Sequence, residues 1–462
     1  MQSSDLKELK IAVVGAGYGG AAAAKALSLL GARVDVYEQA SRIREVGAGI
    51  GLRPATMNRF REWGIFDAVA RVSSPSESFE ILTATGEPIM REEWPADGRQ
   101  THTHLIHRGD FIDALMSVLP DGMVHLGHRL ESVQDKGDRS VLTFADGRSV
   151  EADLVVGADG IRSVVRRELF GDQGPVFSGE HAYRAVISLD DAHGLVTDDN
   201  LRMYIGRGTK VYLLPLRHRG QVSFDITALC PDATWAPEVT KDDLLATVEG
   251  FDERLVAITH GLDMDTVNIR AVYDIDPVAR WHSDSVVLVG DAAHSMLHHQ
   301  GQGANSAIED GGALADALRR ADSLPEALAL FQATRKPVTD ELQRISRQGW
   351  TEAEIDEVFP GQRPATTGQP PATTGQRSAT TGQRPATTGP RPATTRQRPA
   401  TTGQRPATTG QRPATTGPRA ETTGQRPATS GPRAGGWGGG RGGGGGGGGG
   451  GRGGGGRGGA GG

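Results

Sequence analysis

Three histidines and an aspartate lie close together in GDAAHSMLHHQGQGANSAIEDGG, residues 290–312. Imidazole and carboxylate side chains bind metal ions or transfer protons, so His294, His298, His299 and Asp291 are candidates for a metal site or a catalytic base. Zinc requires ligands that converge at about 2.1 Å, and the adjacent side chains of His298 and His299 tend to diverge. Because the sequence has no HExxH motif and no Cys/His pair beside them, we expect no metal here. Catalysis and the lining of a larger site stay open.

A glycine-rich turn near the start of the chain is a second candidate site. Gly15, Gly17 and Gly20 form GxGxxG between an apolar run, residues 11–14, and an alanine-rich stretch, residues 19–30. The first glycine permits a tight turn, the second lets a pyrophosphate approach the backbone, and the third lets a helix pack on the strand. The N–H groups and dipole at the start of that helix favour an anion.

An acidic residue completes this pattern. Glu38 ends the second strand, 18 residues after Gly20, where a carboxylate accepts hydrogen bonds from ribose hydroxyls. A glycine turn alone can be purely structural, but the strand, the helix and the acid together predict dinucleotide binding. The sequence has one such fingerprint, whereas enzymes with two dinucleotide domains normally show two. Other motifs must therefore indicate which dinucleotide stays bound.

Further apolar strands position these motifs. DLVVGADG (153–160) and SDSVVLVGDAAH (283–294) each end in a turn, and ligands of open α/β sheets bind outside the carboxyl ends of such strands. Stretches such as RMYIGRGTKVYLLPL alternate in polarity, which is typical of antiparallel strands with glycine turns. We predict an α/β fold in which a Rossmann-like nucleotide-binding domain, residues 8–75, 100–174 and 276–350, carries an inserted β-rich substrate domain, residues 76–99 and 175–275.

Composition divides the chain into two unlike parts. Ten heptads of the form QRPATTG occupy residues 362–431, and an arginine-interrupted glycine run follows. No heptad position is apolar enough for a coiled-coil seam, so we expect 362–462 to be a disordered tail. The tail holds 14 of the 50 basic and one of the 56 acidic residues. The remaining 36 basic and 55 acidic residues give the core a net charge of −19, which does not favour nucleic-acid binding by the core.

Several features bear on the compartment. Cys230 is the one cysteine, so no disulfide forms within the chain, and the N-terminal residues do not have the pattern of a secretory signal. The sequence has no run of about 20 apolar residues, so we expect no membrane span. The expectation is a cytoplasmic protein, monomeric or homodimeric.

Taken together, the motifs resemble those of the group A flavoprotein monooxygenases. DLVVGADGIRSVVR resembles the Asp-Gly motif of that family, and VVLVGDAAHSMLHHQGQGANSAIED resembles its Gly-Asp motif and the following helix. With GxGxxG, Glu38 and VGAGIGLRP (46–54), the resemblance extends from residue 10 to about 345. Single-component aromatic hydroxylases, such as salicylate hydroxylase, 3-hydroxybenzoate 6-hydroxylase and 6-hydroxynicotinate 3-monooxygenase, are the most similar type. The resemblance implies a Rossmann-like FAD-binding domain, bound FAD and transient NADH or NADPH.

The resemblance also implies roles for individual residues. The turn glycines, including Gly19, hold the pyrophosphate, and Glu38 with Gln39 holds the adenosine ribose. Asp159 lies near the pyrophosphate and Asp291 bonds the ribityl chain. Other cofactor contacts implied for this sequence are Arg44 near the ring, Arg108 facing the FAD, the backbone of Leu130 near the adenine, the possible phosphate ligands Arg162 and Arg166, and the N–H groups of Gly303, Ala304 and Asn305 at the flavin pyrimidine.

The implied reaction uses these parts in order. NAD(P)H reduces the flavin, O2 adds to give the C4a-hydroperoxide, and the distal oxygen passes to an electron-rich aromatic or heteroaromatic ring. A helix that begins near Gly303 aims its positive end at the N1–C2 region of the anionic reduced flavin, worth up to ~2 kcal/mol when partly buried. The protein must exclude water and hold the ring close.

The histidines lie beside the implied reaction site. The family usually has proline at the position of His298, so this residue adds a titratable group and an N–H; it is either a base or a tolerated substitution. His299 is a candidate substrate contact, whereas His294 matches a family histidine that is more often structural. Tyr212 and Tyr204 lie on predicted strands of the inserted domain and either reach the substrate or pack as ordinary sheet aromatics. Arg53 either binds a substrate carboxylate or caps the surface.

Other functions fit the sequence less well. A related FAD monooxygenase or epoxidase with a larger natural-product substrate is the first alternative. A flavin halogenase is disfavoured because no WxWxIP motif is present. A non-catalytic flavin-binding protein, or one that works through its tail, comes from another class; RNA binding by the tail would need interleaved aromatics, and Trp437 stands alone there. We expect an enzyme whose partners are a small aromatic molecule and O2.

Overall fold

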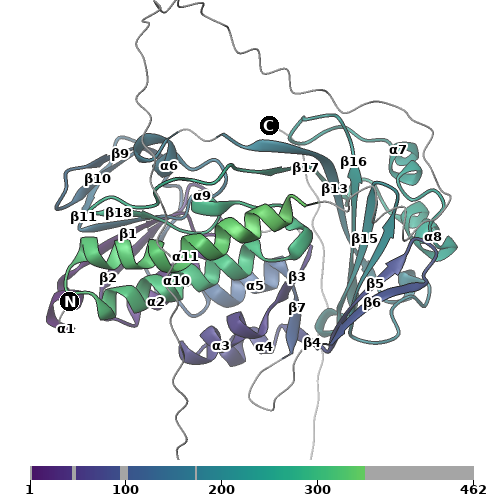
Figure 1. Cartoon of the computed structure of the whole chain (residues 1–462). Coiled ribbons are helices and arrows are strands. Elements are labelled where there is room, and N and C mark those ends of the chain that lie inside the picture. Colours follow the sequence, from purple (N-terminus) through teal and green to yellow (C-terminus); the bar gives the residue numbers. More distant parts are fainter. Residues whose placement is uncertain (1–2, 44–47, 94–101, 172–173, 349–462) are drawn as a thin grey trace, which may run out of the picture. The chain divides into compact units, whose positions relative to one another are not determined.

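The structure is a computed structural model that describes residues 3–43, 48–93, 102–171 and 174–348 (Figure 1). Arg44 and the tail predicted over 362–462 lie outside these residues. No helix among the described residues is long and apolar enough to cross a bilayer.

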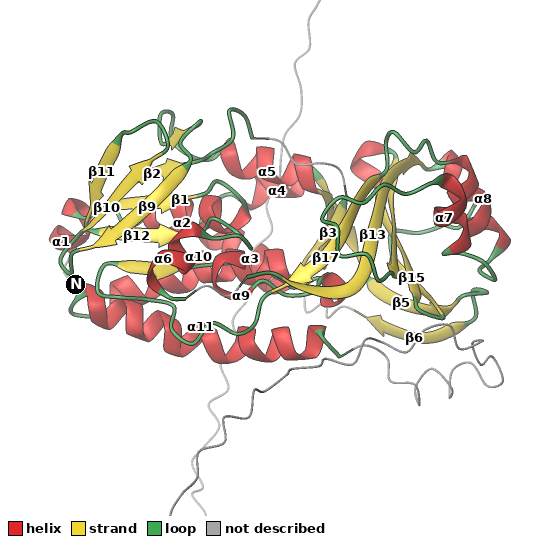
Figure 2. Ribbon diagram, turned by 90° about the horizontal axis from the view of Figure 1, so that it is seen from above, coloured by secondary structure: helices red, strands yellow, loops and turns green. Residues whose placement is uncertain are grey.

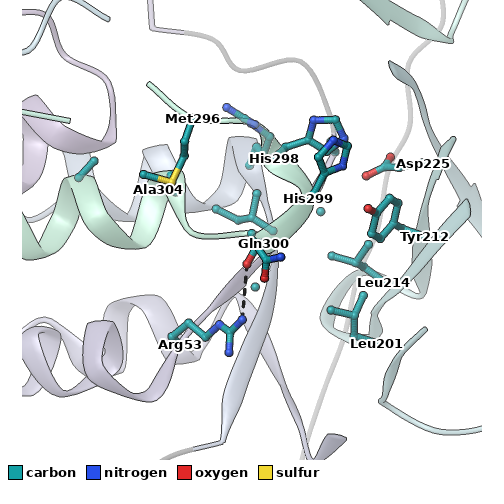
Figure 3. A pocket seen from close by; sticks show the side chains of 18 of the residues that line it. Arg53, Leu201, Tyr212, Leu214, Asp225, Met296, His298, His299, Gln300 and Ala304 are labelled. Atoms are coloured by element: carbon teal, nitrogen blue, oxygen red, sulfur yellow. Dashed lines mark hydrogen bonds between the residues drawn. The ribbon is translucent and has the colours of Figure 1, made fainter. Parts of the chain in front are cut away.

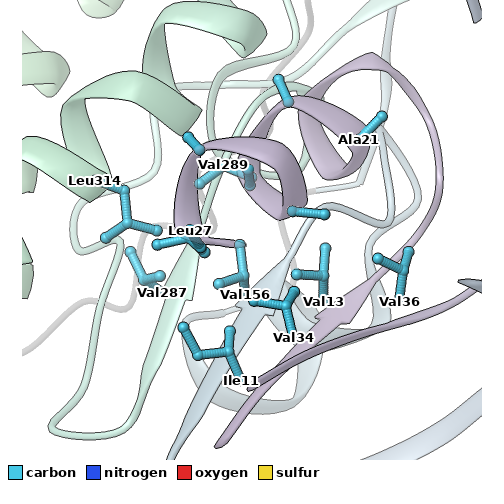
Figure 4. Packing of buried hydrophobic residues seen from close by; sticks show 14 of the residues in the cluster. Ile11, Val13, Ala21, Leu27, Val34, Val36, Val156, Val287, Val289 and Leu314 are labelled. Carbon is cyan, nitrogen blue, oxygen red and sulfur yellow. The ribbon is translucent and has the colours of Figure 1, made fainter. Parts of the chain in front are cut away.

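A five-stranded parallel sheet forms the first half of the described fold. Three of its strands, β1, β12 and β18, are short and almost wholly buried, which explains their continuous apolar sequences. Figure 4 shows side chains of these strands, such as Val156 and Val287, packed against Leu27 and Leu314 of two covering helices. In spatial order the strands are β18 (Val286–Leu288), β12 (Leu154–Gly157), β1 (Lys10–Val14), β2 (Arg33–Tyr37) and β8 (Val124–His125).

The strand order reverses beside β1. The chain passes from β1 to β2 on one side and later returns to β12 on the other. The carboxyl ends of β1 and β12 approach so closely that a Cβ at Gly15 would lie 2.4 Å from the carbonyl oxygen of Ala158. Gly15 has φ of +99°, a conformation that also favours glycine. Such a reversal is where doubly wound sheets bind ligands.

Two helices cross closely over the sheet. At their crossing, a Cβ on Gly311 would lie 2.7 Å from the backbone nitrogen of Ala23, so the alanine-rich sequence of one helix and a glycine of the other permit the contact. The helices around this sheet are α1 (Ser3–Glu8), α2 (Tyr18–Ser28), α5 (Arg108–Met116), α6 (Val164–Leu169), α9 (Asp291–His294), α10 (Gly303–Arg320) and α11 (Leu324–Ser346).

A seven-stranded mixed sheet forms the second half (Figure 2). Both segments that we assign to the inserted domain contribute strands to it, joined by parallel pairing of β5 with β14. One face packs on α7 (Lys241–Ala246) and α8 (Glu253–Gly261). In spatial order its strands are β17 (Asn268–Asp274), β13 (Val176–Ser188), β16 (Gln221–Leu229), β15 (Thr209–Leu216), β14 (Leu201–Gly206), β5 (Ser78–Thr83) and β6 (Pro88–Glu93).

Two small antiparallel sheets complete the fold. One comprises β9 (Leu130–Asp135), β10 (Ser140–Phe144) and β11 (Ser149–Ala152). The other comprises β3 (Gly49–Leu52), β7 (Thr103–His107) and β4 (Ser73–Ser76), and lies near the sheet of seven strands. The remaining short helices are α3 (Pro54–Glu62), α4 (Phe66–Ala70), η1 (Asp190–Ala192), η2 (Arg217–Arg219) and η3 (His298–Gln300).

Candidate functional site

A cavity of about 1230 Å³ connects the two large sheets. Residues at the carboxyl ends of the parallel strands line one part of it, and one face of the seven-stranded sheet lines the other. Its volume exceeds the roughly 300–1,000 Å³ of ordinary small-molecule sites. The cavity therefore has room for a large ligand and a small one together.

The glycine turn supplies one end of this cavity. Gly17 is the N-cap of α2 and has no side chain with which to accept from the first N–H groups of the helix. A Cβ at Gly17 would meet nothing within 4 Å, whereas a Cβ at Gly20 would lie 1.9 Å from the Gly15 carbonyl oxygen. Gly17 and Gly19 line the cavity, and Gly15 and Gly20 instead permit the close contacts behind it.

Glu38 supports this turn. Its carboxylate accepts hydrogen bonds from the N–H groups of Ala16 and Ala40, both at 2.8 Å. Gln39 is exposed beside it, and Leu130, the first residue of β9, is buried in the core. These three predicted cofactor residues lie outside the set that lines the cavity.

The Asp-Gly turn after β12 forms the adjacent wall. Gly160 lines the cavity, while the carboxylate of Asp159 accepts from the Ser163 hydroxyl at 2.5 Å and from the N–H of Val164 at 2.7 Å, so it caps α6. Burial raises the pKa of Asp159 despite these hydrogen bonds. Arg166 is buried and donates to the carbonyl of Ala292 at 2.8 Å. Arg166 therefore links the start of α6 to α9 in this structure.

Arg162, the other predicted phosphate ligand, faces Trp235, in the segment that follows β16. Its guanidinium lies 4.1 Å from the ring centroid of Trp235, a cation–π contact. This contact joins the two halves of the fold beside the Asp-Gly turn.

Asp291 enters the cavity from the first turn of α9. Its side chain is accessible from the cavity. Because the cavity lies inside the protein, loss of contact with bulk water raises the pKa of this carboxyl group. The preceding Gly290 has φ of +59°, and its N–H donates to Asp310 at 2.9 Å. A Cβ at Gly303 would lie 4.0 Å from a carboxylate oxygen of Asp291, so the Gly-Asp motif and the start of α10 adjoin.

A buried ion network fixes this region. Asp310 accepts from His294 at 2.6 Å and from Arg335 at 2.7 Å. Burial would raise the pKa of Asp310, but these two partners outweigh it and hold the pKa at about 2. His294 is fully buried, which agrees with the structural role that the sequence favoured.

The N-terminus of α10 opens onto the cavity. The helix begins at Gly303, as predicted, and its N-cap Gln302 makes no side-chain capping bond. Gly303 and Ala304 line the cavity. These first-turn N–H groups are therefore placed to bind an acceptor group on a ligand.

Asn305 fastens this helix start to the loop before α3. Its side-chain oxygen accepts from the Arg53 N–H at 2.8 Å and the Thr56 hydroxyl at 2.7 Å. Its side-chain nitrogen donates to the carbonyls of Gly51 and Gly301, each at 2.9 Å. The sequence pointed only to the backbone of Asn305, because side-chain contacts across some 250 residues leave no local pattern.

The three histidines have three different partners. His294 bonds Asp310, whereas the Nε2 of His298 lies 2.8 Å from the Thr227 hydroxyl and the Nε2 of His299 lies 2.8 Å from Glu180. His298 and His299 line the cavity, and Figure 3 shows both facing Asp225 and Tyr212 of the sheet.

The charges around the two cavity histidines differ. Burial, with the positive charge of Arg184, lowers the pKa of His298 well below its usual range, so His298 is neutral near pH 7. The Nδ1 of His299 lies 3.4 Å from the ammonium of Lys210. Because an ammonium only donates, this geometry favours the His299 tautomer that donates from Nε2 to Glu180. His299 thus uses both ring nitrogens within the protein.

The two predicted tyrosines lie on opposite faces of the sheet. Tyr212 lines the cavity. Tyr204 is buried in the core beneath α7 and α8 and does not line the cavity, which is the packing of an ordinary sheet aromatic. Side chains alternate along a strand, and Met203 takes the cavity face of β14 instead. Arg53 and Arg108 both line the cavity, and the guanidinium of Arg53 lies 3.5 Å from the Gln300 carbonyl (Figure 3).

Sequence reasoning missed four charged residues of the cavity wall: Arg184, Lys210, Asp225 and Glu180. The first three line the cavity, and Glu180 lies beside it. On each strand these side chains occupy the face that looks toward the cavity, and the alternation of side chains along the strands was the available signal. Burial raises the pKa of Asp225 to about 6, against the opposing charge of Arg184.

These features fit FAD, a long ligand with charged and polar groups along its length. Open space lies above Gly17, where a pyrophosphate needs it, and two helix N-termini without side-chain caps, those of α2 and α10, face the same cavity. Asp291 supplies a carboxylate between them for ligand hydroxyl groups.

Comparison with known proteins agrees with this geometry. The family described as FAD binding domain matches residues 8–345. The 3-amino-4-hydroxybenzoate 2-monooxygenase PtnB3 of Streptomyces platensis is 33% identical over 349 residues, which cover 73% of this chain and 87% of that protein. The 6-hydroxynicotinate 3-monooxygenase of Pseudomonas fluorescens is also 33% identical, over 351 residues that cover 73% of this chain and 90% of that protein.

Solved structures show the same fold. An HpxO variant of Klebsiella pneumoniae complexed with FAD has a TM-score of 0.68 and 25% identity, covering 76% of this chain and 90% of that one. A salicylate hydroxylase substrate complex has a TM-score of 0.64 and 25% identity, covering 74% and 88%. The protein is thus an FAD-dependent monooxygenase, and its chain belongs to the group A FAD-dependent aromatic hydroxylases.

Proposed function

We propose that this protein uses NAD(P)H and O2 to hydroxylate an electron-rich aromatic or heteroaromatic small molecule. One observation carries the proposal: a single cavity joins the glycine turn and Asp291 to a partly apolar, partly charged face of the inserted sheet. The relatives named above, which act on aminohydroxybenzoate and hydroxynicotinate, support the substrate class.

The cofactor would occupy the end formed by the parallel sheet. Gly17 and Gly19 would hold its pyrophosphate, Asp291 its ribityl hydroxyls, and the N–H groups of Gly303 and Ala304 its pyrimidine edge. Glu38 lies at the end of β2, on the side expected for the adenosine ribose. Bound FAD supplies the redox chemistry, accepting electrons from NAD(P)H and activating O2 for transfer of one oxygen atom to the ring.

The substrate would occupy the end of the cavity formed by the seven-stranded sheet. Met203, Ile81 and Leu214 offer an apolar surface for an aromatic ring. The neutral ring of His298 and the Glu180-bound ring of His299 cover the side nearer α10, and they help exclude water from the reacting centre.

The test is turnover by the purified, FAD-loaded full chain. NADH and NADPH oxidation are followed with a panel of phenols, anilines, hydroxybenzoates and hydroxypyridines, while product and hydrogen peroxide are quantified separately. We expect at least one compound to stimulate oxidation at least tenfold and to gain one oxygen atom. A yellow protein with no stimulation across the panel would contradict the proposal.

A further inference from the structure

Three polar side chains form a row across the cavity wall. Arg184 on β13 is directly opposite Asp225 on β16, and Asp225 is directly opposite Tyr212 on β15. Directly opposed residues of antiparallel strands have Cβ atoms about 4.5–5.5 Å apart. All three line the cavity, and Figure 3 shows Asp225 and Tyr212 together on the sheet side of it.

This row is poorly satisfied within the protein. Asp225 accepts from the Ser223 hydroxyl at 3.1 Å. Among the residues that the structure describes, the Arg184 guanidinium makes no hydrogen bond or ion pair within 4.0 Å, and the buried Tyr212 hydroxyl has no hydrogen-bond partner. Burying charged and polar groups without partners costs free energy, so such a row on a cavity wall indicates a ligand.

The opposite face of the same sheet provides a contrast. There Arg202 donates to Glu80 at 2.8 Å and to Asp198 at 2.5 Å, so its charge is paired within the protein. Arg202, on the core face of the sheet, is therefore paired, whereas Arg184, on the cavity face, has no hydrogen-bonded partner among the described residues.

We propose that Arg184 and Asp225 form the pair that recognises the polar edge of the substrate. Arg184 binds an acceptor on the ring, a carboxylate or oxo group, and Asp225 accepts a hydrogen bond from a hydroxyl or N–H donor on the same edge. This inference rests on the proposed function and adds the substituents that the substrate carries.

Two neighbouring strands agree with this orientation, although Lys210 on β15 and Glu92 on β6 also line the cavity. The strands beyond Tyr212, β14 and β5, present Met203 and Ile81 to the cavity, without a charge. A ring with polar substituents on one edge would place its apolar edge on these strands and its polar edge on β13 and β16. Because burial raises the pKa of Asp225 only to about 6, its carboxylate is mostly ionised at pH 7.5 and able to accept from a donor, beside the charges of Arg184 and Arg108.

The test uses oxidised, FAD-loaded enzyme and probe ligands, so it does not depend on turnover. Binding is measured from the change in flavin absorbance with 2-, 3- and 4-hydroxybenzoate, their methoxy counterparts, benzoate and phenol. We expect one hydroxybenzoate to bind at least tenfold more tightly than its methoxy counterpart and than phenol. Arg184→Met should remove the advantage over phenol, Asp225→Ala should remove the advantage over the methoxy compound, and Arg184→Lys should restore part of the first.

Two exposed residues of the inserted domain give matched controls. Arg207→Met and Asp265→Ala remove the same charges away from the cavity and should leave every preference unchanged. FAD content and melting temperature check that each variant is folded. If the wild-type enzyme shows no preference for a hydroxybenzoate, or if Arg184→Met and Asp225→Ala keep it, the pair is not the recognition site. Failure of the proposed function is distinct: it is the absence of stimulated NAD(P)H oxidation across the turnover panel.

Discussion

Two buried aspartates show how partners decide what a carboxylate does in this protein. Asp310 has His294, Arg335 and the Gly290 N–H as hydrogen-bond donors, and its pKa falls to about 2. Asp225 has the Ser223 hydroxyl, and its pKa rises to about 6. Asp310 therefore stabilises the fold as an anion, whereas ionised Asp225 costs stability where it lines the cavity.

The cost at Asp225 predicts a stabilising substitution. Its pKa lies about two units above the ordinary value of 3.8. This shift corresponds to a loss of at most about 3 kcal/mol in the free energy of unfolding at pH 8. Asp225→Asn removes that charge and should raise the free energy of unfolding at pH 8 by 1–3 kcal/mol, on the order implied by this linkage. Chemical denaturation at saturating FAD measures the change.

The pH dependence of this gain has a definite sign. A raised carboxyl pKa destabilises the folded state above that pKa, and the penalty disappears once the group is protonated in both states, below about pH 4. The gain from Asp225→Asn should therefore be full above pH 6 and vanish near pH 4. The exposed Asp265→Asn should show no such pattern, and an equal gain at pH 8 and pH 4 would refute the assignment.

At His298 the resemblance to the family led us to expect proline, and the surroundings of this histidine bear on whether it acts as a base or is a tolerated substitution. Because burial holds its pKa well below the usual range, His298 is neutral near pH 7. Leu297 before it has φ −64° and ψ 145°, which suits a residue that precedes proline.

We therefore expect His298→Pro to fold and to retain FAD. The shape of its kcat/KM profile from pH 6 to 9 should match that of the wild type, while the fraction of NAD(P)H oxidation that ends as hydrogen peroxide should rise, because the cavity loses a ring that excludes water. Parallel measurement of product and peroxide tests this. A shifted profile with unchanged coupling would instead make His298 a proton-transfer residue.

At the scale of elements, two glycines at the start of α2 have different roles. Gly17 has φ −71° and ψ −173°, a conformation open to alanine, and a Cβ there would project into the cavity without meeting another atom within 4 Å. A Cβ at Gly20 would lie 1.9 Å from the Gly15 carbonyl oxygen. Gly17→Ala should keep the melting temperature of the FAD-free protein and weaken FAD binding at least tenfold. Gly20→Ala should destabilise the fold itself, by about 1–3 kcal/mol or more.

Thermal unfolding without FAD, combined with FAD titration, separates the two effects. Gly64→Ala, at an open site with φ +69°, is a control for a strained but solvent-facing glycine and should leave FAD affinity unchanged. If Gly17→Ala bound FAD as tightly as the wild type, the space above Gly17 would not be the pyrophosphate site.

The same scale shows what a sequence can predict. The apolar strands, the glycine turn and the start of α10 at Gly303 follow from short-range patterns, and the predicted α/β fold is confirmed. The alternation along β14 and β15 was visible, but its phase was not: Tyr204 and Met203 are both apolar enough for either face. The face of the sheet that lines the cavity is the one that α7 and α8 do not cover. The position of these helices depends on tertiary packing, which the local sequence pattern does not reveal.

At the scale of the whole molecule, the last turn of α11 holds the cavity loop in place. The Ser346 hydroxyl accepts from the N–H of Leu297, beside His298, at 3.3 Å. The Gln343 amide donates to the carbonyls of Ser295 and Ile275 at 3.0 and 3.2 Å. A helix at the end of the described chain thus supports the segment that faces the substrate end of the cavity.

Arg347 connects the same helix end to the seven-stranded sheet. Its guanidinium donates to Asp274 at the end of β17, at 2.5 and 3.0 Å, and to Asp276 at 2.9 Å. These bonds connect the end of α11 to the end of β17, although Arg347 lies more than 70 residues after its two partners in the sequence. A chain that ends after Arg347 keeps them, and a chain that ends before Gln343 loses the whole set.

Two truncations therefore have opposite expected outcomes. A chain of residues 1–361 should bind FAD and turn over within about twofold of the full chain, because it retains every contact described here and the full match to the FAD binding domain. A chain of residues 1–340 should lose FAD and should lose stability, because the groups that Gln343, Ser346 and Arg347 bond would be left without these partners, at a cost on the order of 1–3 kcal/mol for each buried group. FAD content, melting temperature and stimulated NAD(P)H oxidation are measured for both. Loss of turnover in the 1–361 chain would show that the repeat segment acts in catalysis, and an active 1–340 chain would show that α11 does not support the cavity loop.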